Sequence, residues 1–243
     1  ISLYEYLNIM YKVISNKNST MSLPVPMLNI MNGGCHANNN VDIQEFMIIP
    51  SNKFNFKDGL MKSVEVYTNL KSLLKEKGLS VSVGDEGGFA PNLKTSEEVL
   101  DLIILSIERA GLIYLDDMSI ALDCAASELF SEDSYKLTGE NKKFSSDEML
   151  FYMQALVDKY EIKSVEDPFD EKDWDAWKTI TKNNNDIQIV GDDIFVTQEK
   201  ILRKGIDSKV ANSILVKLNQ VGTLSETMQA ISLAKNSGYK TII

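Results

Sequence analysis

Short apolar runs that end on a charged residue recur in the second half of the chain. Residues 162–168 read Ile-Lys-Ser-Val-Glu-Asp-Pro, so an apolar run leads to Glu166 and Asp167 and stops at a proline. Strand interiors disfavour Asp and Glu, and proline cannot donate to a sheet ladder. The pattern therefore predicts a short strand that carries its acids at the carboxyl end.

The same design places Asp123, Asp192 and Lys217 at the ends of three other apolar runs. The steps from Glu166 to Asp192 and from Asp192 to Lys217 each fit one strand plus one helix, and the longer step from Asp123 leaves room for a hairpin. Successive parallel strands end on the same edge of a sheet. We therefore expect three acids and a lysine along one rim.

Helical periodicity fills the intervals between these strands. Helices are expected from Leu60 to a stop at Gly78, from Thr95 to Ile107, from Ser145 to Tyr160, around Trp174 to Ile180, at 199–206 and from Thr223. In the first helix we expect the core-facing stripe to consist of Leu60, Val64, Tyr67, Leu70 and Leu74. Capping boxes are predicted at residues 95–98 and 145–148.

Extended segments are expected at residues 23–30 and 44–50, and a hairpin at 135–144 should turn at Gly139. We expect Trp174 and Trp177 to pack in the core, because they lie three apart beside apolar residues. Repeating strand–helix units predict an α/β fold with a parallel sheet, either open or closed into a barrel.

The 243 residues are 44% hydrophobic, which supports a large buried core. A net charge of −10 argues against a nucleic-acid binder, since such a protein needs a basic face. No apolar run is long enough to cross a membrane. Two cysteines, Cys35 and Cys124, fit a reducing compartment better than a disulfide framework, so we expect a cytoplasmic protein.

Both ends suggest an internal portion of a longer protein. The chain begins at Ile1 without a methionine, and residues 238–243 lead from a helix stop into an apolar strand. We expect residues 1–20 to be the end of a preceding domain plus a linker. Residues 21–243 are then expected to form the main α/β unit.

Three converging carboxylates repel one another unless a cation lies between them. Oxygen ligands with no histidine or cysteine suit Mg²⁺. Any one of Asp123, Glu166 and Asp192 is explained more simply as a helix cap, but three in succession with a matching lysine favour a metal site. Lys217 is either a side chain that reaches out to water or a general base whose pKa burial or neighbouring charge lowers.

Two further residues stand in loops. Glu86 lies among Gly84, Gly87 and Gly88, which allow close approach of a ligand to the backbone, although a flexible acidic turn has the same composition. His36 is the only histidine, and it follows Gly33 and Gly34 just after a predicted strand. Both a structural and a functional role remain open for it.

The motifs in register strongly resemble those of the enolase family. They are residues 23–26 (Leu-Pro-Val-Pro), 32–37 (Asn-Gly-Gly-Cys-His-Ala), 42–47 (Asp-Ile-Gln-Glu-Phe-Met), 84–88 (Gly-Asp-Glu-Gly-Gly), 122–128 (Leu-Asp-Cys-Ala-Ala-Ser-Glu), 164–168, 191–193 (Gly-Asp-Asp) and 215–220 (Leu-Val-Lys-Leu-Asn-Gln). The resemblance covers nearly the whole chain and is closer to bacterial members. It implies an enolase-type β/α (TIM-like) barrel preceded by a smaller α+β domain, and a cytoplasmic homodimer.

The resemblance also implies a reaction and the roles of residues. The reaction is the reversible dehydration of 2-phosphoglycerate to phosphoenolpyruvate in glycolysis, with two Mg²⁺ per site in the complete enzyme. Asp123, Glu166 and Asp192 are expected to hold the first Mg²⁺, which binds the substrate carboxylate. Lys217 is the expected base and Glu86 the expected acid, and the substrate pocket is expected to be lined by His36, Glu45, Glu166 and Asp192. A lysine or histidine base with Mg²⁺ is the general pattern of this superfamily.

The match departs from the family in several places. Cys35 stands where Ser or Glu is expected, and the phosphate-gripping Ser-His-Arg-Ser segment, a second active-site lysine and the N-terminal domain are expected outside this stretch. We therefore expect a barrel without its last strands that is inactive and poorly folded when isolated. The alternatives are another member of the superfamily and a non-catalytic, enolase-derived fragment or surface-binding protein.

Overall fold

The structure is a computed structural model that describes residues 1–16, 18 and 20–243. Its helices are α1 (Leu3–Ser15), α2 (Phe56–Glu76), α3 (Ser96–Arg109), α4 (Ala126–Leu129), α5 (Ser146–Tyr160), α6 (Trp174–Asn183), α7 (Glu199–Ser208), α8 (Leu218–Val221) and α9 (Leu224–Asn236), with a 3₁₀ turn η1 (Gly34–His36). Its strands are β1 (Leu28–Asn32), β2 (Glu45–Pro50), β3 (Met118–Asp123), β4 (Phe130–Ser131), β5 (Ser134–Leu137), β6 (Lys142–Phe144), β7 (Ser164–Glu166), β8 (Gln188–Gly191), β9 (Ser213–Leu215) and β10 (Lys240–Ile242).

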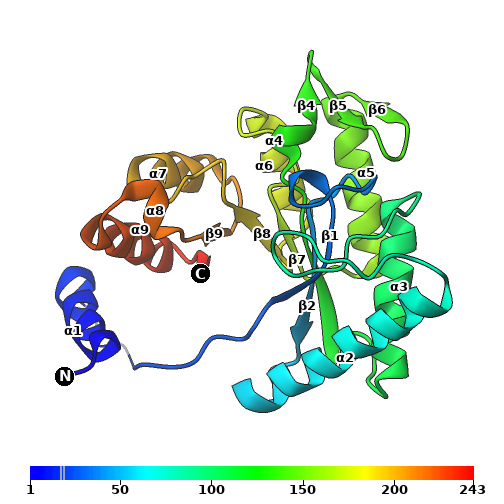
Figure 1. Ribbon diagram of the computed structural model, residues 1–243. Helices are drawn as coiled ribbons and strands as arrows, with labels where there is room; N and C mark the ends of the chain where they lie inside the picture. The colour runs from blue at the N-terminus through cyan, green and yellow to red at the C-terminus, as the bar shows by residue number, and fades with distance from the viewer. Residues whose placement is uncertain (17, 19) are drawn as a thin grey trace.

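A seven-stranded sheet in the order β1-β2-β3-β7-β8-β9-β10 organises the chain. Within this sheet the strands from β3 through β7, β8 and β9 to β10 are parallel, with helices between them, as the sequence predicts (Figure 1). The strands β4, β5 and β6 form a separate antiparallel sheet. The first two strands differ, since β1–β2 and β2–β3 are antiparallel. The sheet is therefore mixed, and β2 begins at the edge where β3 ends.

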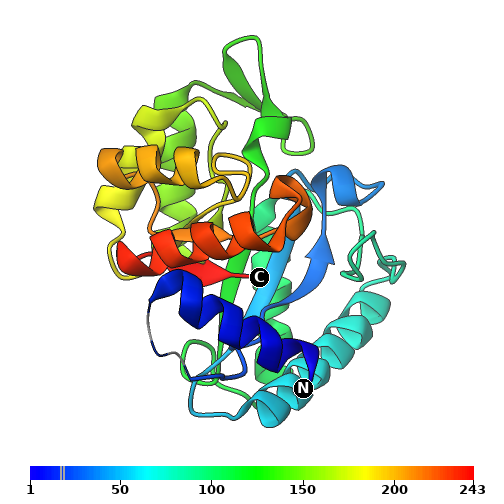
Figure 2. The ribbon, with the colours of Figure 1, turned by 90° about the vertical axis from the view of Figure 1, so that its left-hand side faces the viewer.

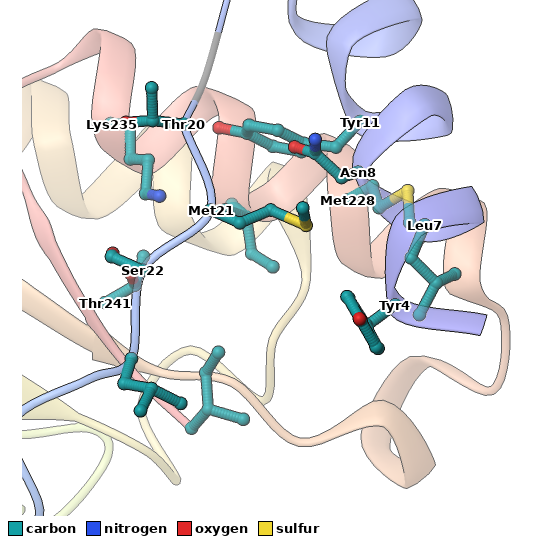
Figure 3. Close-up of a pocket in the computed structure, with 13 residues that line it drawn as sticks. Tyr4, Leu7, Asn8, Tyr11, Thr20, Met21, Ser22, Met228, Lys235 and Thr241 are labelled. Atoms are coloured by element: carbon teal, nitrogen blue, oxygen red, sulfur yellow. The ribbon is translucent and has the colours of Figure 1, made fainter. Parts of the chain in front are cut away.

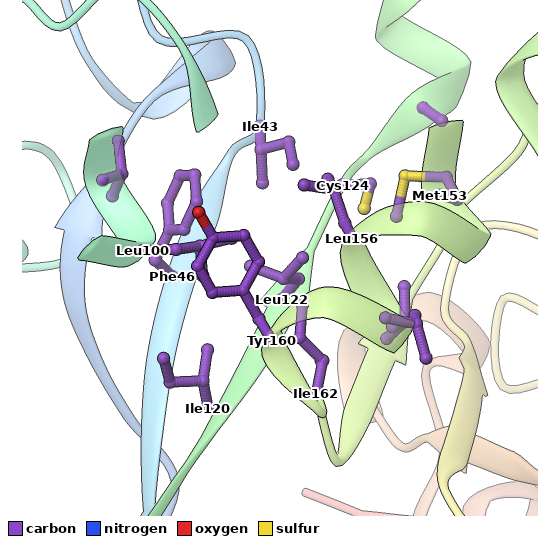
Figure 4. Close-up of a cluster of buried hydrophobic side chains, with 14 of the residues drawn as sticks. Ile43, Phe46, Leu100, Ile120, Leu122, Cys124, Met153, Leu156, Tyr160 and Ile162 are labelled. Carbon is purple, nitrogen blue, oxygen red and sulfur yellow. The ribbon is translucent and has the colours of Figure 1, made fainter. Parts of the chain in front are cut away.

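The core lies where β2 and β3 meet α3 and α5. Figure 4 shows Phe46 and Leu122 from the sheet facing Leu100 and Tyr160 from the two helices, and all four side chains are buried. Burying a large apolar side chain stabilises a fold by about 1.5–3 kcal/mol, so this cluster holds the two helices against the sheet.

Helix α2 uses a different face from the predicted one. Leu70 and Leu74 are buried as expected, but Leu60 and Val64 are 38% and 52% exposed. Gly59 lies against the ring of Pro50, where an added Cβ would be 3.0 Å from Cγ. The absence of a side chain at Gly59 lets the helix approach β2 along that line, which turns its neighbours outward.

The two capping predictions have different outcomes. At α5, the side chains of Ser145 and Glu148 form the complete reciprocal box. At α3, the Thr95 hydroxyl accepts from the Glu98 amide, but the Glu98 carboxylate accepts from Lys94 instead of from the cap residue. The box at residues 95–98 is therefore only half formed.

The two tryptophans predicted to pack in the core differ in burial. Trp177 is completely buried, which confirms the core prediction for it. Trp174 is half-buried and packs against the edge of the core, where the Lys204 ammonium lies 3.8 Å from its ring centroid, so the prediction is confirmed for Trp174 only in part. A cation over an indole face keeps its charge in water while it covers the ring.

Helix α1 is present as the sequence predicts and packs beside α9 near the end of β10 (Figure 2). The predicted linker at 15–19 includes residues 17 and 19, which lie outside the described residues. The division at residue 20 stays a prediction. Within the described part of the chain, no helix is long and apolar enough to cross a membrane.

The predicted hairpin forms as β5–β6 and docks on the loop before β2. The amides of Gly139 and Glu140 both donate to the Asp42 carboxylate at 2.9 Å. A Cβ on Gly139 would lie 1.7 Å from the carbonyl oxygen of Asn40. Only glycine allows this contact without displacement of the backbone.

We expect Gly139→Ala to lower the free energy of unfolding by about 3 kcal/mol, since overpacking against a fixed carbonyl is costly. Urea denaturation measures this loss. Gly111→Ala is the control, because nothing lies within 4 Å of its added Cβ and only its φ of +73° is unfavourable, at about 1 kcal/mol. Equal losses in the two variants would show that the Asn40 contact is not limiting.

Candidate metal centre and active site

The predicted acids lie on one rim of the sheet. Asp123 ends β3 and pairs with Glu166, which ends β7, while Asp192 directly follows β8. All three are 6% exposed. Parallel strand order places them at adjacent carboxyl ends, as the spacing of the apolar runs predicts.

A fourth acid reaches this rim from the other direction. Because β2 is antiparallel to β3, its first residue, Glu45, pairs with Asp123. Glu45 is 9% exposed. The antiparallel strand therefore brings the start of β2 to the edge that the other strands reach with their ends.

Lys217 joins the rim through an ion pair. Its Nζ lies 2.5 Å from Oδ2 of Asp192, and its side chain is 46% exposed. The lysine therefore extends along the rim with one side open to water, and it contacts a predicted metal ligand directly.

Burial dominates the electrostatics of the acids. It raises the pKa of Asp123 to about 6, and the nearby Asp192 adds to this against hydrogen bonds from Gln44 and Ala125. Burial, then the charges of Asp123 and Asp167, raise the pKa of Glu166 well above its usual value. Without a cation nearby, these two carboxyl groups therefore favour their neutral forms more than exposed carboxyl groups do.

The outcome for Lys217 differs from the expectation of a lowered pKa. Burial does act to lower it, but the hydrogen bond and charge of Asp192, with Glu166 and Asp123, outweigh burial and leave the pKa raised. The neighbouring charges that were expected to lower the pKa of Lys217 are negative here, so they raise it.

His36 and Glu86 come from two loops that pack on each other. The Asp85 amide donates to the His36 carbonyl at 3.0 Å, and a Cβ on Gly84 would lie 2.5 Å from that oxygen. His36 Nδ1 lies 3.3 Å from Glu45 Oε1 and 3.9 Å from Glu86 Oε1. Glycine at position 84 therefore permits the approach that brings these two loop residues to Glu45.

Glu45 is the residue at which the two halves of the site meet. Burial, a hydrogen bond with Glu86 and the charge of Asp123 raise the pKa of Glu45 to about 9, while Lys217 acts in the opposite direction. Glu45 therefore lies within range of the loop acid, a rim acid and the lysine.

The ligand atoms are not equally close. Among the described residues, His36–Glu45–Glu86 and Asp167–Asp192–Asp193 bring their ligand atoms within 4.8 Å of one another. The predicted trio is not such a group, although its members occupy adjacent strand ends. Buried carboxylates with raised pKa values nevertheless offer an oxygen donor set that fits a hard divalent cation.

Three residues to which the sequence assigned no site role contact the predicted ligands. Gln44 Nε2 donates to Asp123 at 3.0 Å, and Gln220 Nε2 donates to Asp192 at 2.7 Å. The Asp167 carboxylate accepts the amides of Asp192 and Asp193. The sequence signal was their position beside predicted site residues.

A separate cavity lies away from the rim. It has a volume of about 680 Å³ and lies between α1, the segment at 20–23, α9 and β10. Figure 3 shows Leu7, Tyr11, Met21 and Met228 around it. Among the described residues that line it, no side chain is a carboxylate or an imidazole. The described part of this cavity therefore offers no acidic side chains like those of the rim.

Comparison with known proteins identifies the family. A model of the enolase C-terminal TIM barrel domain matches residues 20–243. The chain belongs to the enolase family. The enolase of Legionella pneumophila strain Corby is 52% identical over 229 residues, which is 94% of this chain and 54% of that protein, and the strain Lens enolase is 51% identical over the same shares.

Family membership confirms the predicted fold class. The strand–helix succession from β3 to β10 is that of an enolase-type barrel domain, and the antiparallel β1–β2 pair makes its sheet mixed. The chain spans about half the length of the curated enolases it matches.

Proposed function

We propose that the protein carrying this sequence is a Mg²⁺-dependent lyase that reversibly dehydrates 2-phosphoglycerate to phosphoenolpyruvate. The observation that carries the proposal is the position of Glu45, which pairs with Asp123 on the rim and lies beside His36 and Glu86. Lys217 joins the same rim through Asp192. An acid, a base and metal ligands within one small region are what elimination beside a carboxylate requires.

Asp123, Glu166 and Asp192 would hold the first Mg²⁺. Two features support the fit: the three residues share one rim, and all of their donor atoms are oxygens. In addition, the pKa values of Asp123 and Glu166 are raised, and a nearby cation would lower them again by stabilising the carboxylates. Bound Mg²⁺ supplies the charge that stabilises a dianionic intermediate.

Lys217 would take the proton from C2. Its Nζ must be neutral to act, and the ion pair with Asp192 keeps it protonated. A cation held by Asp192 would weaken that pair, so cation binding would make it easier for Lys217 to lose its proton.

Glu86 would protonate the leaving C3 hydroxyl. The C2 proton moves to Lys217 Nζ, the C2–C3 double bond forms, and the C3–O bond breaks as the leaving hydroxyl takes the Glu86 proton and departs as water. His36 Nδ1 and Glu45 Oε1 lie 3.3 Å apart beside Glu86 and would line the substrate pocket.

The remaining parts of the proposal rest on family membership. They are a second Mg²⁺ in each site, a homodimer and a cytoplasmic location. The presence of all three acids, Lys217 and Glu86 favours an enzyme over a non-catalytic surface-binding protein, because such a protein has no need of them.

The test is conversion of 2-phosphoglycerate by the protein carrying this sequence, with Mg²⁺ and with EDTA. Glu86→Gln should lower turnover by about 10²–10⁴-fold and retain exchange of the C2 proton, because only the acid is removed. Glu97→Gln is the control, since Glu97 is similarly exposed and ion-paired away from the rim. Absence of Mg²⁺-dependent turnover in the unmodified protein would refute the proposal.

A further inference from the structure

The turn after β8 contains an unfavourable backbone. Val196 and Thr197 have φ values of +42° and +55°. Side chains branched at Cβ rarely adopt this region, and such conformations persist only where the surroundings fix them. Thr197 is completely buried. Its fixed position therefore calls for an explanation in terms of its contacts.

Thr197 makes two close hydrogen bonds that connect the β8 turn to the segment after β9. Its Oγ1 accepts the backbone N–H of Lys217 at 2.9 Å and lies 2.6 Å from Oε1 of Gln220. A hydroxyl has one proton, and the carbonyl of Leu215 is further away at 3.4 Å. The Thr197 proton therefore goes to Gln220.

This bond fixes the orientation of the Gln220 amide. With its oxygen accepting from Thr197, its nitrogen faces Asp192 and donates to Oδ1 at 2.7 Å. The other oxygen of Asp192 is paired with Lys217 Nζ. The hydrogen bonds of Thr197 and Gln220 thus hold both the backbone of Lys217 and the carboxylate of Asp192.

We propose that Thr197 and Gln220 are positioning residues for this centre, an inference that rests on the proposed function. Thr197 sets the orientation of the Gln220 amide, and Gln220 holds the Asp192 carboxylate in the orientation in which it pairs with Lys217 and would bind the cation. Hydrogen-bond partners that orient a metal-ligating carboxylate affect metal affinity without touching the metal. The unfavourable turn at Val196 is the conformation that places the hydroxyl between the two segments.

The first measurement is Mg²⁺ affinity by calorimetry. Thr197→Val keeps the shape and removes the hydroxyl, and Gln220→Leu removes the amide. Each should weaken Mg²⁺ binding by about 10–100-fold. The double variant should be no weaker than the worse single one, because the two act in series, and Thr197→Ser should restore wild-type affinity.

Thr181→Val is the matched control. The Thr181 hydroxyl also joins two segments, since it donates to the Trp177 carbonyl and accepts the Ala211 amide, but it lies on α6 away from the rim. Thr181→Val should lose about as much stability as Thr197→Val and keep the Mg²⁺ affinity of the unmodified protein. Equal weakening in Thr181→Val and Thr197→Val would show a general structural effect and overturn the inference.

A second measurement needs no metal. The side-chain NH₂ resonances of Gln220 report its bond to Asp192, and they should shift in Thr197→Val but not in Thr197→Ser or Thr181→Val. If the unmodified protein that carries this sequence binds no Mg²⁺, the proposed function fails and these resonances decide the positioning alone. If Mg²⁺ binds and Thr197→Val binds it equally well, the positioning inference fails and the proposed function stands.

Discussion

Replacing Lys217 with alanine is expected to abolish exchange of the C2 proton of 2-phosphoglycerate and to lower turnover by about 10²–10⁴-fold. The variant loses the only lysine among the described residues whose ammonium pairs with a rim acid. Isotope exchange into recovered substrate measures the proton step separately from release of water.

Mg²⁺ binding should survive in Lys217→Ala. The ammonium competes with the cation for Oδ2 of Asp192, so its removal should leave Mg²⁺ affinity unchanged or higher. Lys53→Ala is the matched control, because Lys53 is 41% exposed and pairs with Asp116 and Asp117 at 2.7 Å away from the rim. Retained C2 exchange in Lys217→Ala would exclude it as the base.

Glu166→Gln is expected to reduce Mg²⁺ affinity by more than 100-fold while making the metal-free chain more stable at neutral pH. Glu166 is almost fully buried among Asp123, Asp167 and Asp192, and its pKa is raised. An amide keeps the shape and removes the charge that burial penalises. Calorimetry measures the affinity, and thermal unfolding in EDTA measures the stability.

The pH dependence has a defined sign. A carboxyl whose folded-state pKa is raised stabilises the fold below its unfolded pKa, and this contribution is lost as pH rises through the folded value. With Asp123 titrating near 6, stability in EDTA should fall from about pH 4 toward pH 7, by roughly 3 kcal/mol for this group alone. Bound Mg²⁺ should offset this loss of stability with rising pH. In EDTA, the loss should also be smaller in Glu166→Gln than in the unmodified protein.

Glu140→Gln is the control for Glu166. Its carboxylate is also buried, but it accepts from Ser96 and Tyr152 and pairs with Lys142. Although burial opposes it, these hydrogen bonds hold the pKa of Glu140 below its usual value. Glu140→Gln should therefore destabilise the chain and leave the Mg²⁺ response unchanged. Loss of metal-free stability in both variants would contradict the assignment of Glu166.

Part of the site follows from local pattern. Asp123, Glu166 and Asp192 each interrupt an apolar run at its end, and parallel strands separated by helices bring such ends together. The sequence therefore sufficed to place these acids on one rim. The same argument placed Lys217 on that rim.

Other parts depend on contacts between distant segments. The stripe on α2 was wrong at Leu60 and Val64, because the approach of Gly59 to Pro50 sets which face turns inward. Periodicity fixes the spacing of a face but not the partner that selects it. Trp174 lies at the edge of the core and not inside it for the same reason, since Lys204 from α7 covers part of its ring.

The sequence by itself determined the succession of strands and helices and the acids at the strand ends, because periodicity and strand-end chemistry are local properties. The enolase-type barrel followed from the resemblance of the motifs and not from periodicity. Only the tertiary structure decided that the antiparallel β2 brings Glu45 to Asp123. The folded chain also decided that the Asp192 pair raises the pKa of Lys217, and that Thr197 reaches Gln220. Each of these depends on the distance between atoms far apart in the chain, which no local pattern specifies.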